Sequence, residues 1–473
     1  MTIPGTKYAT GGLARVALGV SLAVSLLSVG SSAWAASESR FSDEPLPFID
    51  DVTGGLPSRT PPLLELGDPF LGTGNLAPGF ELPTGAVWQP RFWVYGSIRS
   101  ALQGYDNDNG PTTLEAAARL DLFGNLQLTG TERILIGVQP FHENGQFTRY
   151  TFKPEAQEGG DDHLNLRIRT LFFEGDIAEL FPRWDVLDSK PNDLGFSVGR
   201  QSMSFQNGFI INDTIDAVGL TRNNVRFQGV PWLINWRTSA VYAWNEIHRD
   251  DNRDDNQANL FGLFTQLDTI PSTFNIDVIY VNSDDANGGD VLVGGVDAIQ
   301  RIGKITTTFR VNASHATDQK TPESDDGVLL FTELSYTPAY TDNIAYLNAF
   351  AGIDNFTSAA RDPTAGGPLG STGILFAARG IGTFPSPLSN RADEAYGAAV
   401  GYQMFLGGIR RQLILEAGGR INDSPGGFDA AGIAARFQQA IGARLLLQLD
   451  GYAVGQEDRD TGLGLRTELQ VKF

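Results

Sequence analysis

Apolar and polar residues alternate along the stretch 462–473. Leu465 and Leu469 fall on one side of this stretch, and Arg466 and Glu468 fall on the other. A period of two predicts a β-strand with one apolar and one charged face. A strand of this kind suits a transmembrane β-barrel, whose apolar face meets lipid and whose polar face meets a water-filled lumen.

The same alternation recurs from Arg91 onward and predicts eighteen strands. In one of them, for example, Ile305 and Phe309 oppose Lys304 and Arg310. Most are long enough for a tilted membrane crossing, which needs about 9–11 residues. The predicted strands span 91–103, 113–128, 131–141, 163–175, 194–203, 217–228, 236–247, 257–268, 273–283, 290–300, 303–313, 327–337, 343–354, 394–406, 411–421, 428–437, 443–454 and 462–473.

The lengths of the connections agree with this arrangement. With Phe473 in the periplasm, turns at that end are mostly short, such as 301–302, and loops at the other end are often long, such as 142–162 and 355–393. The connection 176–193 is long for a periplasmic turn, and we expect a short helix near its start, at 177–181. The predicted fold class is all-β: a transmembrane antiparallel β-barrel of about eighteen strands, formed by residues 89–473.

The N-terminal region predicts export. Lys7 and Arg15 flank the start of the apolar run 16–29, and Ala33-Trp34-Ala35 forms a small-x-small cleavage site. This pattern predicts a signal peptide at 1–35, cleaved near Ala35, and a location in the bacterial outer membrane. A membrane anchor is the alternative, but the apolar run is too short for it.

Residues 36–88 are rich in Pro and Gly and show no sustained period. They predict an irregular periplasmic segment or a small plug inside the pore, and a disordered leader is the alternative.

The composition of the chain narrows the possible classes of protein further. The chain has no cysteine, so an exported form has no disulfide framework. Its net charge is −20, and −22 without the two basic residues of 1–35, which argues against nucleic acid as a partner.

The acidic residues concentrate in predicted outer loops, such as 250–255 and 284–285. We interpret these loops as solvated surface. Divalent cations that bridge them to lipopolysaccharide are an alternative. The Asp-rich stretch 250–255 lacks the spacing of a Ca²⁺-binding loop, so we assign no metal site. The expected surroundings of the barrel are outer-membrane lipid and lipopolysaccharide.

The predicted lumen face is basic by contrast. Its sixteen basic residues are Arg91, Arg99, Arg119, Arg133, Arg167, Arg169, Arg222, Arg226, Arg237, Lys304, Arg310, Arg420, Arg436, Arg444, Arg466 and Lys472. Its seven acidic residues are Glu115, Asp121, Asp277, Glu333, Glu416, Asp450 and Glu468. The excess of nine positive charges predicts a path for anions, because a narrow channel concentrates the field and Arg offers a planar fork for carboxylates. The alternative is that these arginines pair with the acidic residues and stabilise the wall.

The run 196–208, with Gly199-Arg200-Gln201 at its centre, resembles the Gly-Arg-Gln strand of the alginate-export family. The resemblance implies an eighteen-stranded outer-membrane barrel that releases an anionic polysaccharide through an arginine-rich lumen, in cooperation with periplasmic export partners. It also implies that the pore is covered by an outer loop and a periplasmic turn, for which 355–393 and 176–193 are the candidates. Residues 36–88 do not match this family.

Arg200 poses a local problem, because it shares the phase of Phe196 and Val198, whereas Met203 and Phe205 take the opposite phase. We predict a β-bulge near Gly199 that returns Arg200 to the lumen.

Catalysis is not expected. The four histidines are His142, His163, His248 and His315, each on a different predicted hairpin. A Ser-His-acid set can form there in principle. The sequence contains no Gly-x-Ser-x-Gly elbow and no histidines at metal-ligand spacing. We therefore predict no catalytic residue, no metal and no cofactor.

Three functions remain open. The first is an outer-membrane channel with a basic lumen for anionic solutes, such as an anionic polysaccharide exporter. The second is a general or substrate-specific porin for small organic anions. The third is a structural or adhesive surface barrel.

Overall fold

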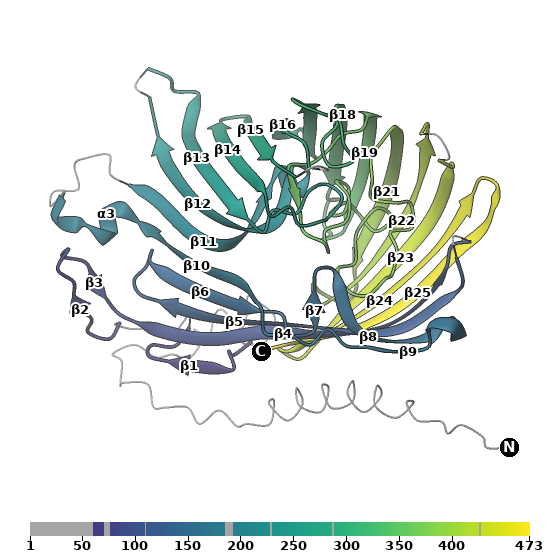
Figure 1. The fold of residues 1–473 in the computed structure, drawn as a ribbon, viewed down its shortest axis with the longest axis horizontal. Coiled ribbons are helices and arrows are strands. Elements are labelled where there is room, and N and C mark those ends of the chain that lie inside the picture. Colours follow the sequence, from purple (N-terminus) through teal and green to yellow (C-terminus); the bar gives the residue numbers. More distant parts are fainter. Residues whose placement is uncertain are drawn as a thin grey trace, which may run out of the picture.

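The computed structural model describes residues 60–473, except 71–75, 109, 185–192, 228, 286–287 and 425–426. The predicted signal peptide and residues 36–59 lie outside the described residues. The described chain forms one closed antiparallel barrel of 18 strands, in which each strand pairs with the next and β25 pairs with β4 (Figure 1). The fold class predicted from alternation is therefore confirmed.

The wall strands are β4 (Arg91–Asp106), β5 (Thr113–Gln127), β6 (Arg133–Val138), β10 (Ile168–Asp176), β11 (Leu194–Phe205), β12 (Ile211–Val225), β13 (Leu233–Asn245), β14 (Ala258–Thr269), β15 (Ser272–Ser283), β16 (Val291–Ile302), β17 (Ile305–Ala316), β18 (Gly327–Tyr336), β19 (Ile344–Asp354), β21 (Ala395–Phe405), β22 (Arg411–Asn422), β23 (Ala430–Ile441), β24 (Leu445–Gln456) and β25 (Arg459–Lys472). The shorter elements are β1 (Leu64–Leu66), β2 (Phe80–Glu81), β3 (Val87–Trp88), β7 (His142–Glu143), β8 (Gln146–Lys153), η1 (Glu155–Gln157), β9 (Gly159–Asp161), α3 (Ile177–Leu180), η2 (Pro182–Trp184), η3 (Gln206–Gly208) and β20 (Ala360–Arg361).

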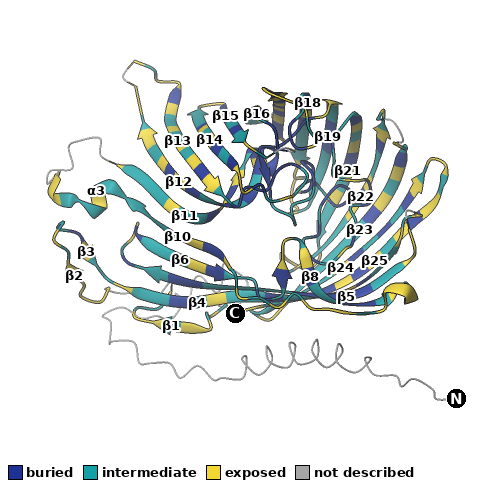
Figure 2. Cartoon of the chain, in the orientation of Figure 1, coloured by how far each residue is buried: buried dark blue, intermediate teal, exposed yellow. Residues whose placement is uncertain are grey.

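The alternation predicted for the C-terminal strand is present in β25. Leu465 is 69% exposed and faces outward, whereas Arg466 is 1% exposed and faces the lumen. The same alternation of exposed and buried positions marks most of the wall in Figure 2. Each predicted strand overlaps one wall strand.

One region of the wall differs from the prediction. The strand predicted to begin at residue 163 begins only at Ile168, and a register shift lies between Ile168 and Thr170. The sequence alternation places Phe172 on the lipid face with Leu166 and Ile168, opposite Arg167 and Arg169. The register shift instead turns Phe172 toward the lumen and leaves Leu171 outside at 43% exposed. The predicted outer loop 142–162 also contains a strand, β8, which pairs with the outer half of β5.

The end of the barrel that holds Lys472 carries the short turns, and we call it the periplasmic end after the predicted orientation. The helix expected after residue 176 is present as α3. In the region 60–88, β1 pairs with β4 and Glu81 forms an ion pair of 2.6 Å with Arg183, so this part lies along the periplasmic rim. None of its described residues lines the lumen cavity presented below.

No helix in the described part of the chain is long and apolar enough to cross a membrane.

Two insertions fill much of the lumen. The tip of the β11–β12 hairpin reaches the far wall, where the side-chain amide of Gln206 donates to Asp277 of β15 at 2.7 Å and the Phe209 ring lies 4.7 Å from the Phe331 ring of β18. The outer loop 355–394 lies beside it, since Ile211 of β12 pairs in parallel with Ala360 of β20. The main hydrophobic core therefore lies inside the barrel, between these insertions and the strands from β13 to β24.

Candidate anion-binding cavity

Loop 355–394 crosses the lumen and contacts both sides of the wall. On one side the backbone N–H of Ile374 donates to Glu416 of β22 at 3.0 Å. On the other, Arg119 of β5 donates to the carbonyl oxygen of Gly380 at 3.0 Å. These two contacts place the loop across the lumen, the position that the family resemblance implied for 355–393. Only part of the lumen stays open beside it.

That open part is a cavity of about 820 Å³ between loop 355–394, the β11–β12 hairpin and the wall strands β5, β6 and β10. Aromatic and aliphatic side chains form one side of it, among them Phe123, Leu135 and Phe172. Its cationic residues are Arg119, Arg133, Arg169 and Arg379. Its acidic residues are Asp121, Glu174, Asp213 and Asp362. The cavity can therefore contact both an apolar body and an anionic group.

Most of the predicted lumen arginines that reach the interior have an acidic partner. Arg99 contacts Glu468 at 2.6 Å, and Arg436 contacts Asp450 at 2.6 Å. The other arginines with an acidic partner are Arg119 with Asp121, Arg133 with Glu174, Arg169 with Asp362, Arg200 with Asp216, Arg310 with Asp297 and Arg466 with Asp450. Arg420 donates instead to the carbonyl oxygen of Arg391. The wall-stabilising alternative thus accounts for much of the basic lumen face.

The remaining predicted residues lie elsewhere. Arg222 lies near the periplasmic end of β12, in the same phase as the outward residues Val218 and Leu220. The others at that end are Arg226, beyond β12; Arg237, beside Gln266; Lys304 and Arg444, in turns; and Arg91 and Lys472, at strand ends. Arg167 lies before β10, at the outer end. The predicted excess of nine positive charges is therefore not gathered in the cavity.

Arg200 pairs with Asp216 and Glu246, and it does so without the predicted bulge. β11 pairs with β10 and with β12 in continuous register through Gly199. Gly199 is needed there for another reason: a Cβ at this position would lie 2.3 Å from the carbonyl oxygen of Leu171. Arg200 remains on the same face as Val198. Beyond Val198 the hairpin tip leaves the wall, and this face borders the cavity instead of lipid.

Two cavity arginines keep free N–H groups. Arg379, on the crossing loop, is 8% exposed and donates only through Nη2, to the carbonyl oxygen of Ile374 at 2.9 Å; its Nε and Nη1 have no hydrogen-bond partner. Arg169 is 6% exposed, and its Nη1 has no hydrogen-bond partner either. The side-chain amide nitrogen of Gln201 is a third unpartnered donor on the cavity. Buried donors of this kind normally have a partner, so these three can receive one from a solute.

The electrostatic environment of Arg379 fits such a role. Burial lowers its pKa to about 10, and the neighbouring positive charge of Arg436 acts in the same direction. Arg379 therefore stays protonated at neutral pH. An anion that approaches it compensates for its burial and for the positive charge of Arg436.

Arg379 is absent from the residues predicted from the sequence to face the lumen, because it follows the apolar run 374–378 in a loop and not in a strand. The available signal was a lone Arg after an apolar run in the longest outer loop. Arg361 of the same loop, which is fully buried, was not predicted either.

The histidines lie apart from one another. The His248 ring contacts Asp213 at 2.9 Å, and the His315 ring contacts Asp326 at 2.7 Å. His163 lies near Asp161 at 3.2 Å. Across the described ranges, no group of three or more His, Cys, Asp or Glu is arranged to hold a metal ion.

Comparison with known proteins shows the fold. No family model matches the sequence, and no curated protein matches it. Among solved structures, the chain is similar to a BenF-like porin from Pseudomonas fluorescens Pf-5 (TM-score 0.54, 10% identity, covering 81% of this chain and 99% of that one). It is also similar to Acinetobacter baumannii OccAB4 (TM-score 0.53, 10% identity, 83% and 100% covered). A third is Pseudomonas aeruginosa OccK2 in complex with glucuronate (TM-score 0.52, 10% identity, 81% and 98% covered). The fold is thus that of outer-membrane porins, a class of channels rather than enzymes.

Proposed function

We propose that this chain is an outer-membrane channel that passes small organic anions. The observation that carries the proposal is the pair of buried arginines, Arg169 and Arg379, whose free N–H groups border the cavity. A carboxylate in the cavity can gain charge-assisted hydrogen bonds from Arg379, which forms no ion pair within the described part of the chain. It can gain another from Nη1 of Arg169, whose Nη2 is paired with Asp362.

Size favours a small solute over a polymer. The β11–β12 tip and loop 355–394 occupy the lumen that a polysaccharide chain needs, and the cavity of about 820 Å³ is within the range of small-molecule sites. The glucuronate complex of OccK2, a similar fold, supports an anionic solute of this size. Of the functions left open by the sequence, the porin for small organic anions is therefore favoured over polysaccharide export, which also requires export partners.

The test is current through planar bilayers that contain the purified protein. We expect the reversal potential in a salt gradient to show anion preference, and glucuronate to reduce the current in a saturable way. Arg379→Gln should weaken the glucuronate effect by about tenfold or more, because the loss of hydrogen bonds to a charged group corresponds to about 1.5–3 kcal/mol.

Arg183→Gln is the matched control, since Arg183 is an exposed periplasmic arginine paired with Glu81. Cation preference of the unmodified channel, or equal glucuronate block in Arg379→Gln and Arg183→Gln, would contradict the proposal.

A further inference from the structure

The wall of the barrel is interrupted in its outer half where the β11–β12 hairpin leaves it. Pairing between β10 and β11 ends at Leu171 with Arg200, and pairing between β12 and β13 ends at Asp216 with Asn245. Beyond these points, β11 and β12 pair only with each other and with β20. Their outer edges therefore take no part in the wall.

The strands on the other side of the interruption do not close it. In the outer half, β8 replaces β6 as the partner of β5, and β9 pairs with the far edge of β8. Among the described residues, no strand pairs with the far edge of β9 or with the outer edge of β11 beyond Arg200, whereas β12 pairs with β13 up to Asn245, the last residue of β13. Unpaired strand edges are costly in lipid, so this part of the wall must be in contact with water or polar side chains.

The sequence of the hairpin agrees with contact with water. Where the hairpin is part of the wall, its outward face is apolar, with Val198, Val218 and Leu220 exposed. Past the interruption, the same face is polar. Its residues there are Arg200, Ser202, Ser204, Asn212, Thr214 and Asp216. Ser202, Asn212 and Thr214 also line the cavity, so the interruption and the cavity adjoin.

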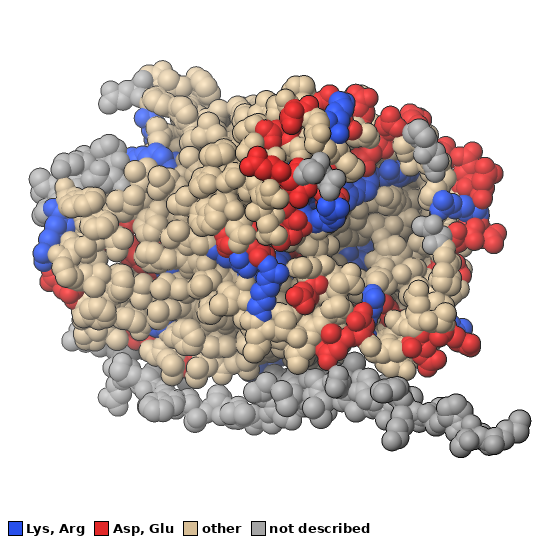
Figure 3. All heavy atoms as spheres, in the orientation of Figure 1, with Lys and Arg blue, Asp and Glu red and all other residues tan. Residues whose placement is uncertain are grey.

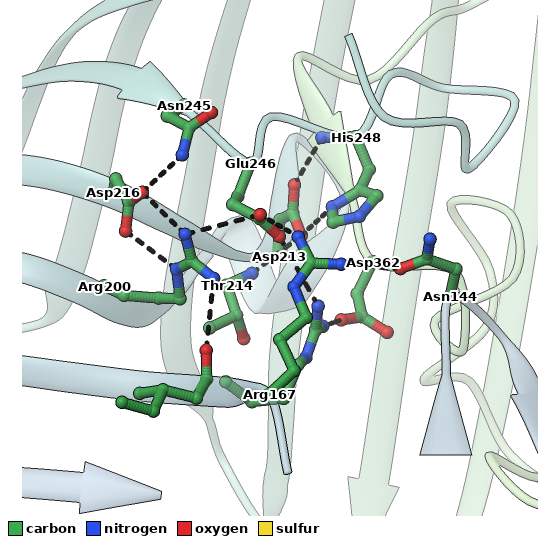
Figure 4. Close-up of polar contacts among 12 residues, drawn as sticks. Asn144, Arg167, Arg200, Asp213, Thr214, Asp216, Asn245, Glu246, His248 and Asp362 are labelled. Atoms are coloured by element: carbon green, nitrogen blue, oxygen red, sulfur yellow. Dashed lines mark hydrogen bonds and ion pairs between the residues drawn. The ribbon is translucent and has the colours of Figure 1, made fainter. Parts of the chain in front are cut away.

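Ion pairs cover the interruption. Arg167 forms an ion pair with Glu246, and Arg200 contacts Asp216 at 2.8 Å and Glu246 at 3.3 Å (Figure 4). Arg169 lies 3.8 Å from Glu246. Figure 3 shows charged side chains gathered near the middle of this face, to the right of a mostly uncharged area. Leu166 is 78% exposed on the segment that leads into β10.

We infer that this interruption is a water-filled side entrance to the lumen cavity, which the Arg167–Glu246 ion pair closes. Its use by organic anions rests on the proposed function, whereas its contact with water does not. An anion that arrives at the outer boundary of the membrane can replace Glu246 as the partner of Arg167 and Arg200. It then meets Arg169 at the edge of the cavity.

Thiol labelling tests the contact with water, and the absence of cysteine makes the protein suited to it. In proteoliposomes, Ser202→Cys and Ser204→Cys should react with a charged methanethiosulfonate reagent. Val198→Cys and Val218→Cys, on the same face of the same strands, should not react, because lipid covers them. Protection of all four cysteines would place lipid against the hairpin and overturn the inference.

Blocking tests the entrance itself. A bulky polyethylene-glycol maleimide on Leu166→Cys should reduce anion current several-fold. The same label on Ile270→Cys, equally exposed in a periplasmic turn, should leave the current unchanged. Full labelling of Leu166→Cys with unchanged current would overturn the side entrance while the proposed function stands. An unmodified channel without anion preference would instead overturn the proposed function.

Discussion

The hairpins β24–β25 and β11–β12 both consist of alternating strands, yet only the first remains in the wall along its whole length. On β24 and β25 the outward positions are mostly apolar, as at Leu449 and Leu465, and the inward positions Asp450 and Arg466 form an ion pair of 3.1 Å. On β11 the outward face becomes polar beyond Val198, and the inward face becomes apolar at Met203.

This difference shows that alternation alone does not place a strand against lipid. A charged side chain on the lipid face costs about 2–4 kcal/mol at the bilayer midplane. The hairpin avoids this cost by folding inward, where Ile215 and Ala217 are fully buried in the core within the barrel. The composition of the two faces, rather than their period, determines whether a strand stays in the wall.

The largest expected effect comes from releasing the hairpin tip from the crossing loop. Arg361 is 0% exposed and donates to the carbonyl oxygens of Gly208 at 2.8 Å, Gly366 at 2.7 Å and Gly367 at 2.6 Å. Arg361→Gln leaves buried carbonyl groups without partners, at about 1–3 kcal/mol each. We expect a several-fold larger single-channel conductance and weaker anion preference, measured in planar bilayers.

Arg253→Gln is the control for this change, since Arg253 is an arginine of an outer loop whose side chain is 64% exposed and whose ion pairs contribute little to stability. Unchanged conductance in folded Arg361→Gln protein would show that the hairpin is held in the lumen without the loop.

An intermediate effect is expected from placing an arginine on each of the two outward faces. Leu465→Arg on β25 should lower the free energy of unfolding in lipid vesicles by about 2–4 kcal/mol, because the side chain meets hydrocarbon. Ser202→Arg should change it by about 0.5 kcal/mol or less, because the side chain meets water. Equal losses in denaturant titrations would show that both faces contact lipid.

A smaller effect is expected from a change of pH, through two carboxyl groups near the junction of the two insertions and the regular wall. Burial, with Asp250 nearby, raises the pKa of Asp393 to about 6, and burial, with Asp251 nearby, raises the pKa of Glu323 to about 7. Both carboxyl groups lie in outer loops and become neutral as pH falls through these values. Anion preference, read from reversal potentials, should therefore increase between pH 8 and pH 5.

Asp393→Asn should flatten the part of this profile near pH 6, whereas Asp458→Asn, in an exposed turn, should leave it unchanged. A profile that is the same in both variants would assign the pH dependence to other groups.

Much of the barrel could be predicted from local pattern. Lipid selects apolar residues at every second position of a strand. The number of strands, and which residues face the lumen, can therefore be predicted from alternation without knowledge of contacts, as at Leu465 and Arg466. The inserted hairpin could not be predicted in this way, because burial of Met203 and Phe205 inside the barrel gives the same alternation as burial in a wall. The bulge predicted near Gly199 was wrong for this reason.

The candidate site could be predicted only in part. The sequence identified Arg169 as a lumen residue by its phase, and the structure places it on the cavity. It gave no means to separate Arg169, whose Nη1 has no hydrogen-bond partner, from Arg133 or Arg436, because the number of hydrogen bonds an arginine makes depends on which side chains lie near it in the fold. Arg379 lies on a loop, where no period relates residue number to direction.

By itself, the sequence determined an eighteen-stranded membrane barrel and most of its inner and outer faces. The reason is that alternate residues of a membrane-spanning strand face lipid and water, so they are alternately apolar and polar. Only the tertiary structure decided which strands stay in the wall, what fills the lumen and which arginines keep free N–H groups. Those properties depend on contacts between segments far apart in the chain, such as Arg361 with Gly208 and Arg119 with Gly380. Local alternation in the sequence contains no information about these contacts.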